Sequence, residues 1–379
     1  MKKSRAFFIF WGIGLLLLAS RGMGFIKEVE HVAKPLAQLG NSEKSFPLQI
    51  TSLAFSPDGK ILASGKRNGA IAAWNMETNS VMYEIKGYDG FEKNMLYGFE
   101  DFIRFRPQGK SFLTFTEEDK IKEWNAHTGE QMESPFISAG KPQFPRSYQS
   151  HFDFSKSGKL IALFHFNTNV DMIGSDTIFR GVKIIDAESG KTIKKLDTIY
   201  PVSILSFSMD EKSLLMVGSY DWGSAWMYNI ESGEEIWREK GSRSGGTGSP
   251  FFNGGAFSPD NQCFAIATDA YWGGATIQLW KYPSLEKSHI LKVKQGHIKF
   301  AFSPDGNLIA VSGLHPHVEI FDVKTGNKIT EFKAHDKRVY AIAFSPDGKK
   351  LATGSDDTTI KIWDMTELDK KITGNEKGF

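Results

Sequence analysis

The chain has 379 residues, of which 40% are hydrophobic and 24% are charged, a composition that excludes an intrinsically disordered protein. Its excess of positive charge lies in the first 24 residues, which carry Lys2, Lys3, Arg5 and Arg21 and no acid. Without these four, the basic residues fall from 46 to 42 against 44 acidic residues, so we expect no nucleic-acid partner. The single cysteine, Cys263, excludes an intramolecular disulfide and a multi-cysteine zinc site.

The N-terminal segment has the layout of a secretory signal peptide. Between Arg5 and Arg21 lie 15 uncharged residues, mostly Phe, Ile and Leu. As a helix this run would span about 22 Å, which is short of the ~30 Å hydrocarbon core of a bilayer. A positive start, a short apolar run and small residues after it are typical of export signals. We therefore predict that residues 1–24 are a signal peptide.

The small residues suit cleavage after Gly22 or Gly24, which would release the rest of the chain into the periplasm or the extracellular space. The alternative is an uncleaved signal anchor, with the protein held at the membrane by residues 6–20. In that case the anchor is the only membrane contact that we expect.

A phrase of the type Phe-Ser-Pro-Asp-Gly-Lys recurs along the chain. It is intact at residues 55–60 and 344–349, and related forms occur five more times. The phrases begin at Phe55, Phe105, Phe154, Phe207, Phe257, Phe302 and Phe344. A near-constant period of about 40–50 residues is typical of a repeat architecture.

Each repeat has the same internal order of short strands and turns. In the last repeat an alternating strand at 339–344 leads into the phrase, whose Pro, Asp and Gly favour a tight turn, and a second strand follows at 350–353. A third strand ends in an aromatic residue and a polar one, and a fourth completes the unit. In the fifth unit we expect Cys263 to be buried in the second strand, on one face with Ala265 and Ala267.

The segment from residue 334 to 364, which contains AFSPDGKKLATGSDDTTIKIWD, resembles a WD repeat (tryptophan–aspartate repeat) closely. The resemblance extends over all seven units, roughly residues 34–370, and is weaker in units two to six. It implies an all-β fold, a seven-bladed β-propeller of four-stranded antiparallel blades, formed by residues 25–379.

The resemblance also implies a buried hydrogen-bonded set in the seventh unit. The residues at the matching positions are His335, Thr353, Asp357 and Trp363. In this family such residues hold the blade together, so we interpret His335 as structural. We predict no catalytic, cofactor-binding or metal-binding residues and no cofactor.

A propeller leaves no open edge if its last blade takes a strand from the other end of the chain. The stretch 34–40 reads as a strand placed ahead of the first unit. We predict that it forms the outer strand of the seventh blade, beside 358–363. The alternative is that the C-terminal tail, 366–373, occupies this position.

Insertions into the repeat fall only between blades or between the second and third strands of a blade. In an antiparallel meander these two kinds of connection lie on the same face of the disc. The insertions are at 87–100, 138–149, 167–180, 219–224, 241–250 and 269–274. Long loops on a rigid scaffold often carry function, and aromatic residues often anchor interfaces.

We predict a partner-binding surface formed by the aromatic residues that we assign to these loops. They are Tyr97, Phe99, Tyr220, Trp222, Trp226, Tyr271 and Trp272. The alternative is that these side chains fold back and cover the blade ends.

The sequence contains no phosphate-binding loop, no nucleophile elbow and no zinc-protease motif. We therefore expect a non-catalytic, exported scaffold for protein–protein interaction, with a partner of unknown identity. The alternative is an exported enzyme or small-ligand binder that resembles quinoprotein, lactonase or Tol-associated propellers. Such a protein would need acids, His or Arg converging at the mouth of the central channel.

Overall fold

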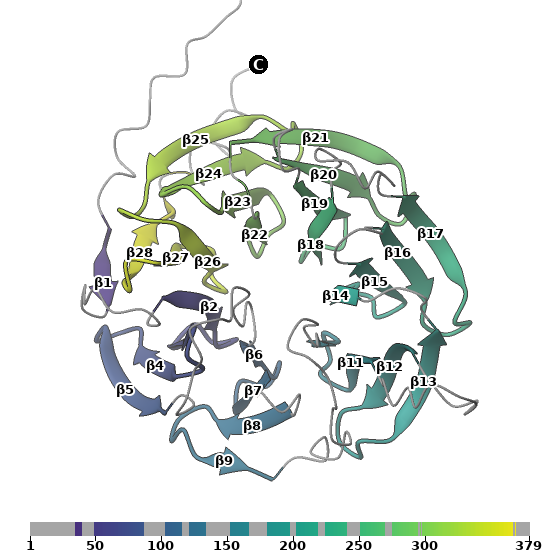
Figure 1. Ribbon diagram of the computed structural model, residues 1–379, viewed down its shortest axis with the longest axis horizontal. Helices are drawn as coiled ribbons and strands as arrows, with labels where there is room; N and C mark the ends of the chain where they lie inside the picture. Colours follow the sequence, from purple (N-terminus) through teal and green to yellow (C-terminus); the bar gives the residue numbers. More distant parts are fainter. Residues whose placement is uncertain are drawn as a thin grey trace, which may run out of the picture.

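The computed structural model describes residues 35–39, 49–86, 103–115, 121–133, 152–166, 180–197, 202–218, 224–240, 251–269, 275–294, 296, 298–366 and 368. In these residues 28 strands form seven four-stranded antiparallel sheets, which are arranged as blades in a ring (Figure 1). The all-β, seven-bladed prediction is confirmed. The predicted signal segment, 1–24, lies outside the described residues.

The blades follow the chain, and each begins with its innermost strand. Blade 1 comprises β2 (Ile50–Phe55), β3 (Ile61–Lys66), β4 (Ile71–Asn75) and β5 (Ser80–Ile85), and blade 2 comprises β6 (Ile103–Phe105), β7 (Ser111–Phe115), β8 (Ile121–Asn125) and β9 (Gln131–Met132). Blade 3 comprises β10 (Phe152–Phe154), β11 (Leu160–Phe166), β12 (Arg180–Asp186) and β13 (Thr192–Asp197), and blade 4 comprises β14 (Val202–Phe207), β15 (Ser213–Gly218), β16 (Ser224–Asn229) and β17 (Glu235–Lys240). Blade 5 comprises β18 (Phe251–Phe257), β19 (Cys263–Asp269), β20 (Ala275–Lys281) and β21 (Lys287–Val293), and blade 6 comprises β22 (Lys299–Phe302), β23 (Leu308–Ser312), β24 (His317–Asp322) and β25 (Lys328–Lys333). Blade 7 comprises β26 (Val339–Phe344), β27 (Lys350–Ser355), β28 (Ile360–Asp364) and β1 (Ala37–Leu39).

The seventh blade joins the two ends of the described chain. Strand β1 pairs antiparallel with β28, with Ala37 opposite Ile362 and Leu39 opposite Ile360. The prediction that the N-terminal stretch closes the ring is confirmed, although the strand is limited to three residues. This position in the sheet is not taken by the C-terminal tail.

The hydrophobic core consists of seven clusters, and each cluster fills the space between two neighbouring blades. Strand β19 illustrates why, because its alternating side chains serve two different clusters. Cys263, Ala265 and Ala267 face blade 6, whereas Phe264 and Ile266 face blade 4. Cys263 is 8% exposed, so its predicted burial and its shared face with the two alanines are confirmed.

The turn between the first and second strands is stabilised by the recurring Ser and Asp. In blade 1 the Ser56 hydroxyl donates to Asp58 at 2.6 Å and accepts from the Ile61 amide at 2.9 Å. Gly59 adopts φ of 70°, which glycine tolerates without strain. Where the repeat lacks this glycine, Glu211 and Asn261 adopt the same left-handed conformation.

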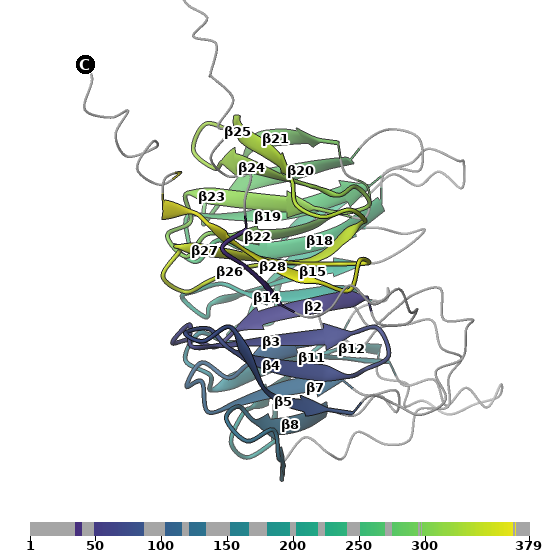
Figure 2. The same ribbon diagram turned by 90° about the vertical axis from the view of Figure 1, so that its left-hand side faces the viewer.

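Because every blade is an antiparallel meander, its connections divide between two faces of the disc (Figure 2). We call the face with the turns between strands one and two and between strands three and four the tight-turn face. The opposite face, called the long-loop face, carries the turns between strands two and three and the links between blades.

Candidate functional site

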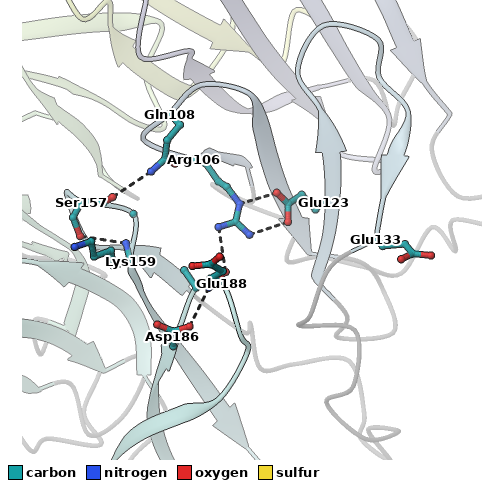
Figure 3. A pocket seen from close by; sticks show the side chains of 10 residues that line it. Arg106, Gln108, Glu123, Glu133, Ser157, Lys159, Asp186 and Glu188 are labelled. Carbon is teal, nitrogen blue, oxygen red and sulfur yellow. Dashed lines mark hydrogen bonds and ion pairs between the residues drawn. The ribbon is translucent and has the colours of Figure 1, made fainter.

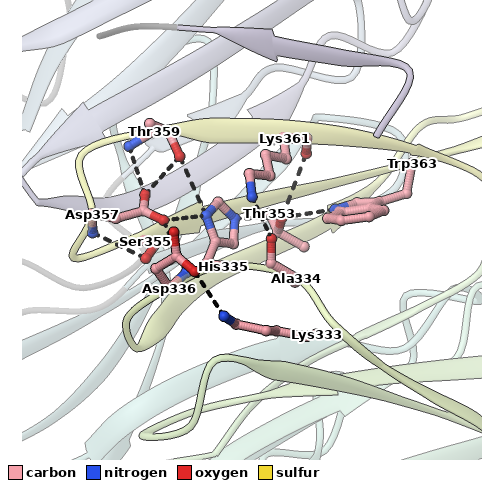
Figure 4. A network of polar contacts seen from close by, with 10 residues as sticks. All are labelled: Lys333, Ala334, His335, Asp336, Thr353, Ser355, Asp357, Thr359, Lys361 and Trp363. Atoms are coloured by element: carbon pink, nitrogen blue, oxygen red, sulfur yellow. Dashed lines mark hydrogen bonds and ion pairs between the residues drawn. The ribbon is translucent and has the colours of Figure 1, made fainter. Parts of the chain in front are cut away.

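The four residues predicted as a hydrogen-bonded set lie together inside blade 7 (Figure 4). The Nδ1 atom of His335 lies 2.9 Å from Oδ2 of Asp357, and its Nε2 atom lies 2.8 Å from Oγ1 of Thr353. The indole N–H of Trp363 donates to the same Thr353 oxygen at 2.9 Å. The Thr359 hydroxyl, which the sequence did not single out, donates to Asp357 at 2.6 Å.

This arrangement has the order hydroxyl, imidazole, carboxylate that hydrolases use, but it is closed to substrate. A carboxylate only accepts hydrogen bonds, so Nδ1–H of His335 donates to Asp357, and Nε2 accepts from the Thr353 hydroxyl. Thr353 is 0% and His335 1% exposed. None of these atoms is accessible to a substrate. Their hydrogen bonds instead hold the strands of the blade together.

Two other blades contain a shorter form of the same contact. The indole of Trp74 donates to the Ser64 hydroxyl at 2.9 Å, and the indole of Trp124 donates to the Thr114 hydroxyl at 2.8 Å. In both cases the hydroxyl residue precedes the tryptophan by ten positions, as in blade 7. The pair in blade 2 was not predicted, although this ten-residue spacing is visible in the sequence and would have identified it.

Blade 5 has lost this contact. Ile266 occupies the position of the Ser or Thr, and Nε1 of Trp280 is buried without a hydrogen-bond partner among the described residues. The ring of Trp280 is held by other means, because Trp237 packs edge-on against it at 4.9 Å and the Lys287 ammonium lies 4.6 Å from its centroid.

One of the predicted partner-binding aromatics is buried, and its assignment to a loop was wrong. Trp226 lies in β16, two residues before Tyr228 on the same side of the strand, and is 3% exposed in the cluster between blades 3 and 4. It packs in the core and offers no surface to a partner. The other candidates, Tyr97, Phe99, Tyr220, Trp222, Tyr271 and Trp272, lie outside the described residues.

Blade 2 replaces the repeated Ser–Asp turn with a buried ion pair (Figure 3). Arg106 stands at the position of the Ser, and its guanidinium binds Glu123 through two hydrogen bonds of 2.7 and 2.9 Å. The Ser111 hydroxyl donates to the same carboxylate at 2.6 Å. Glu123 is 5% exposed and occupies a position where blade 1 has Ala73. Arg106 and Glu123 both depart from the repeat, and the charge of each neutralises that of the other.

Beside this pair, an open hollow of about 550 Å³ lies between blades 2 and 3 on the tight-turn face. Two further polar side chains in its wall have hydrogen-bond partners within the chain. Gln108 donates to the Ser157 carbonyl at 3.2 Å, and Asp186 accepts from the Ser189 hydroxyl at 2.7 Å. We therefore interpret the hollow as a junction between blades.

A second polar cluster, called the 7–1 junction, lies on the long-loop face where blade 7 meets blade 1. It consists of Gln49, Thr51, Arg67, Lys337, Arg338, Tyr340 and Asp356. Backbone hydrogen bonds place these residues: the Arg67 amide donates to the Gln49 carbonyl at 2.9 Å, and the Asp356 amide donates to the Arg338 carbonyl at 3.1 Å. The blades approach closely here, since a Cβ atom on Gly354 would lie 2.4 Å from Ile50.

Asp356 is the electrostatic centre of the 7–1 junction. Burial raises the pKa of its carboxyl, and the positive charges of Arg338, Arg67 and Lys337 oppose that rise. Its Oδ1 atom is buried and has no hydrogen-bond partner among the described residues. The sequence did not reveal this cluster, because residues about 300 positions apart form it.

A further carboxylate lies in the innermost strand of blade 3. Burial raises the pKa of Asp153 to about 6, against the effect of the Arg104 charge, and the Phe207 amide donates to it at 2.9 Å. Asp153 therefore links blades 3 and 4. Among the described residues no three His, Cys, Asp or Glu side chains gather as metal ligands, and no helix is long and apolar enough to cross a membrane.

Known proteins with related sequences share this repeat. The family model described as "WD domain, G-beta repeat" matches residues 34–75 and 326–364. Target of rapamycin complex subunit wat1 of Schizosaccharomyces pombe is 38% identical over 93 residues, which cover 24% of this chain and 29% of that protein. WD repeat-containing protein 1 of Mus musculus is 48% identical over 67 residues, or 17% of this chain and 11% of its own.

Actin-interacting protein 1 of Drosophila melanogaster is 29% identical over 169 residues, which cover 43% of this chain and 26% of that protein. The matched region thus spans less than a third of the length of each of these three relatives. The two segments that the family model matches, 34–75 and 326–364, lie far apart in the sequence and meet where blade 7 adjoins blade 1.

Proposed function

We propose that this chain, whose two matched segments fit the WD40-repeat model, is a non-catalytic propeller scaffold that binds other proteins through its long-loop face. The observation that supports this most is the contrast between the two faces. The tight-turn face repeats one Ser–Asp turn in five blades, at 2.5–2.6 Å in every case. The differences between the repeats are concentrated on the opposite face, where every long insertion begins and ends.

The names of two relatives agree with a binding role. One relative is called a subunit of the target of rapamycin complex, and another an actin-interacting protein. These names describe binding or assembly. We extend to this chain only that class of activity, protein binding.

The alternative, an enzyme or small-ligand binder at the channel mouth, has less support. Arg104 and Asp153 lie in innermost strands, but the Asp153 carboxylate already accepts the Phe207 amide and serves as a link between blades. The hydroxyl–imidazole–carboxylate set of blade 7 is buried. Within the described part of the chain, the first carboxylate has a structural partner and the second set has no exposed catalytic atom.

We also propose that residues 1–24 direct export, to the periplasm or the extracellular space. An intact mass of the mature protein that lacks the first 22 or 24 residues would support cleavage. A mature protein of full mass in the membrane fraction would support the anchor at 6–20 instead. A mature protein of full mass in the soluble cytosolic fraction would contradict export.

The scaffold proposal is tested by site-specific photo-crosslinking in cells. The crosslinker p-benzoylphenylalanine replaces Trp222 or Trp272, in the insertions predicted to bind a partner, and Lys110 on the tight-turn face as the matched control. We expect a discrete crosslinked protein from the first two positions and none from the third. The double variant Trp222→Ala/Trp272→Ala should weaken its capture with little change in melting temperature.

If the double variant unfolds, these aromatics pack against the blades and the alternative explanation of the loops is correct. If it is stable and captures the partner normally, the binding surface lies elsewhere. No crosslinked protein from any position on the long-loop face would contradict the scaffold proposal.

A further inference from the structure

Strand β1 covers only part of the outer edge of blade 7. It has three residues, whereas the fourth strands of blades 1, 3, 4, 5 and 6 have six or seven. In each of the other six blades, the fourth strand also pairs with the third-strand residue at the position of Trp363. In blade 7 the pairing stops at Ile362, so among the described residues β28 has no strand partner on its outer edge at Trp363 and Asp364.

The sequence explains why β1 is short and weakly held. Pro35 has no N–H group, so it cannot extend the ladder beyond Leu36, whose amide donates to the Ile362 carbonyl at 2.6 Å. Within β1 only Leu39 is buried, at 2% exposed, whereas Leu36 is 56% exposed and Gln38 is also exposed. One buried side chain and three paired residues must therefore offset the entropy lost in ordering this stretch. We expect β1 to detach more readily than the longer fourth strands.

The C-terminal tail begins beside this edge and carries a matching sequence. Leu368 is 1% exposed and packs in the cluster between blades 6 and 7, four residues after the end of β28. Residues 369–379 follow it in the sequence. They include Lys-Ile-Thr at 371–373, which repeats the Lys-Ile-Thr at 328–330 that begins β25, the fourth strand of blade 6.

The spacing of the two copies places them at the same point of their blades. Lys328 follows Phe321 of the third strand by seven positions and lies opposite it. Lys371 follows Trp363, the equivalent of Phe321, by eight positions, so the connection is longer by one residue. The register of β25 on β24 predicts three further pairs in blade 7: Thr373 with Ile362, Gly374 with Lys361, and Asn375 with Ile360.

One difference explains why β1 holds the edge in this structure. In blade 6 the fourth strand is anchored by Phe332, which lies opposite Val318 and is 8% exposed. Leu39 is the corresponding anchor of β1, opposite Ile360. The tail offers the polar Asn375 at this point, so its strand lacks the buried side chain that β1 supplies.

We propose that the outer edge of blade 7 accepts either end of the chain, and that residues 371–375 replace β1 on β28 when β1 detaches. The exchange releases residues 35–39 from the propeller and leaves blade 7 with four strands. The tail also pairs with Trp363, which β1 does not reach. The N-terminal stretch is thus a detachable arm, because its release does not open the ring.

The test is disulfide trapping in the purified full-length chain, with Cys263 replaced by Ala and the products identified by intact mass. Each variant carries Lys361→Cys. Gln38→Cys reports on β1, because Gln38 lies opposite Lys361, and Gly374→Cys reports on the tail. Opposite residues of antiparallel strands lie close enough for a disulfide. The matched control is Gly378→Cys, four residues further along the same tail.

We expect the Gln38 pair to oxidise almost completely, and the Gly374 pair to crosslink at least tenfold faster than the Gly378 control. A tail that never pairs would give rates within about twofold of each other, because the two loops differ by only four residues. Leu39→Asn removes the anchor of β1 and should raise the Gly374 rate at least fivefold, with less than a twofold change in the control. Asn375→Leu should also raise the Gly374 rate, and it leaves the described strands intact.

Hydrogen exchange then shows whether β1 leaves the blade. In the chain locked by the disulfide between positions 361 and 374, the amides of 36–39 should exchange at least tenfold faster than in the chain locked between 38 and 361. Equal crosslinking at 374 and 378, or no response to either anchor variant, would overturn the proposal. Protected amides in the tail-locked chain would also overturn it, because the tail would then not replace β1. Disulfides that join two chains would overturn it as well, because a second copy would then supply the strand.

Discussion

The ion pair between Arg106 and Glu123 should be the most costly single contact to break in blade 2. Arg106→Ser removes two hydrogen bonds of 2.7 and 2.9 Å from a carboxylate that is 5% exposed and keeps the hydrogen bond from the Ser111 hydroxyl. Each hydrogen bond to a charged group contributes about 1.5–3 kcal/mol, and breaking a buried ion pair costs about 3–5 kcal/mol. We therefore expect the free energy of unfolding to fall by about 3–5 kcal/mol.

Restoring the pattern of the other blades should recover this loss. The triple variant Arg106→Ser/Gln108→Asp/Glu123→Ile removes the buried charge and recreates the Ser–Asp turn. Replacing a buried ion pair with apolar packing is often neutral or stabilising. In this variant the Ser111 hydroxyl loses its acceptor, which has a small cost. We therefore expect the free energy of unfolding of the triple variant to lie within about 1 kcal/mol of that of the wild type.

The assay is equilibrium unfolding in urea at pH 7, followed by tryptophan fluorescence and circular dichroism. The matched control is Arg238→Ser, which breaks an exposed pair with Glu235 and should cost less than about 1 kcal/mol. The reasoning is refuted if Arg106→Ser costs no more than this control. It is also refuted if the triple variant is as unstable as Arg106→Ser alone.

Three further outcomes are expected, each measured by the same unfolding assay. Trp363→Phe should lower the free energy of unfolding by about 1–2 kcal/mol more than Trp280→Phe, because only the first variant loses an indole hydrogen bond. Equal losses in the two variants would contradict this. Burial raises the pKa of Asp153 to about 6, so the folded state binds this proton more tightly and the wild type should lose roughly 2 kcal/mol as the pH rises from 4 to 7. Asp153→Asn should remove that part of the pH dependence, and an unchanged profile would contradict the assignment. Asp357→Ala should lower the free energy of unfolding by about 1–3 kcal/mol at pH 7. Burial alone would raise the pKa of the Asp357 carboxyl, but hydrogen bonds, chiefly with His335, hold it well below its usual value. The loss of stability should therefore persist down to pH 4 and shrink in stronger acid. No loss of stability at pH 7 would contradict the role of the set.

The fold was predictable because its information is local and repeated. The turn around Gly59 depends on residues within five positions of each other, and seven copies of it indicate the number of blades. The partner of β1 could be inferred because a ring must close. The contact between Trp363 and Thr353 also lies within one blade, at a spacing that the sequence displays.

The sequence was less informative about contacts between blades and about loop boundaries. Asp356 meets the charge of Arg67 only because blade 7 packs on blade 1, and no local pattern encodes that meeting. The mutual compensation of Arg106 and Glu123 becomes visible only when both are compared with the other repeats. Trp226 was assigned to a loop because it lies two residues after the insertion at 219–224, whereas β16 already begins at Ser224.

The pairing of β1 with β28 also fixes the order in which the protein can be completed during synthesis. The ribosome releases β1 early, yet its partner strand follows more than 300 residues later. Until then blade 7 cannot acquire its fourth strand, and the growing chain is an open arc with an uncovered apolar surface at each end. Bringing such distant segments together is slow, and exposed strand edges and apolar surface promote aggregation. A nascent chain that stalls before residue 360 would thus remain an unclosed arc and a substrate for chaperones and proteases.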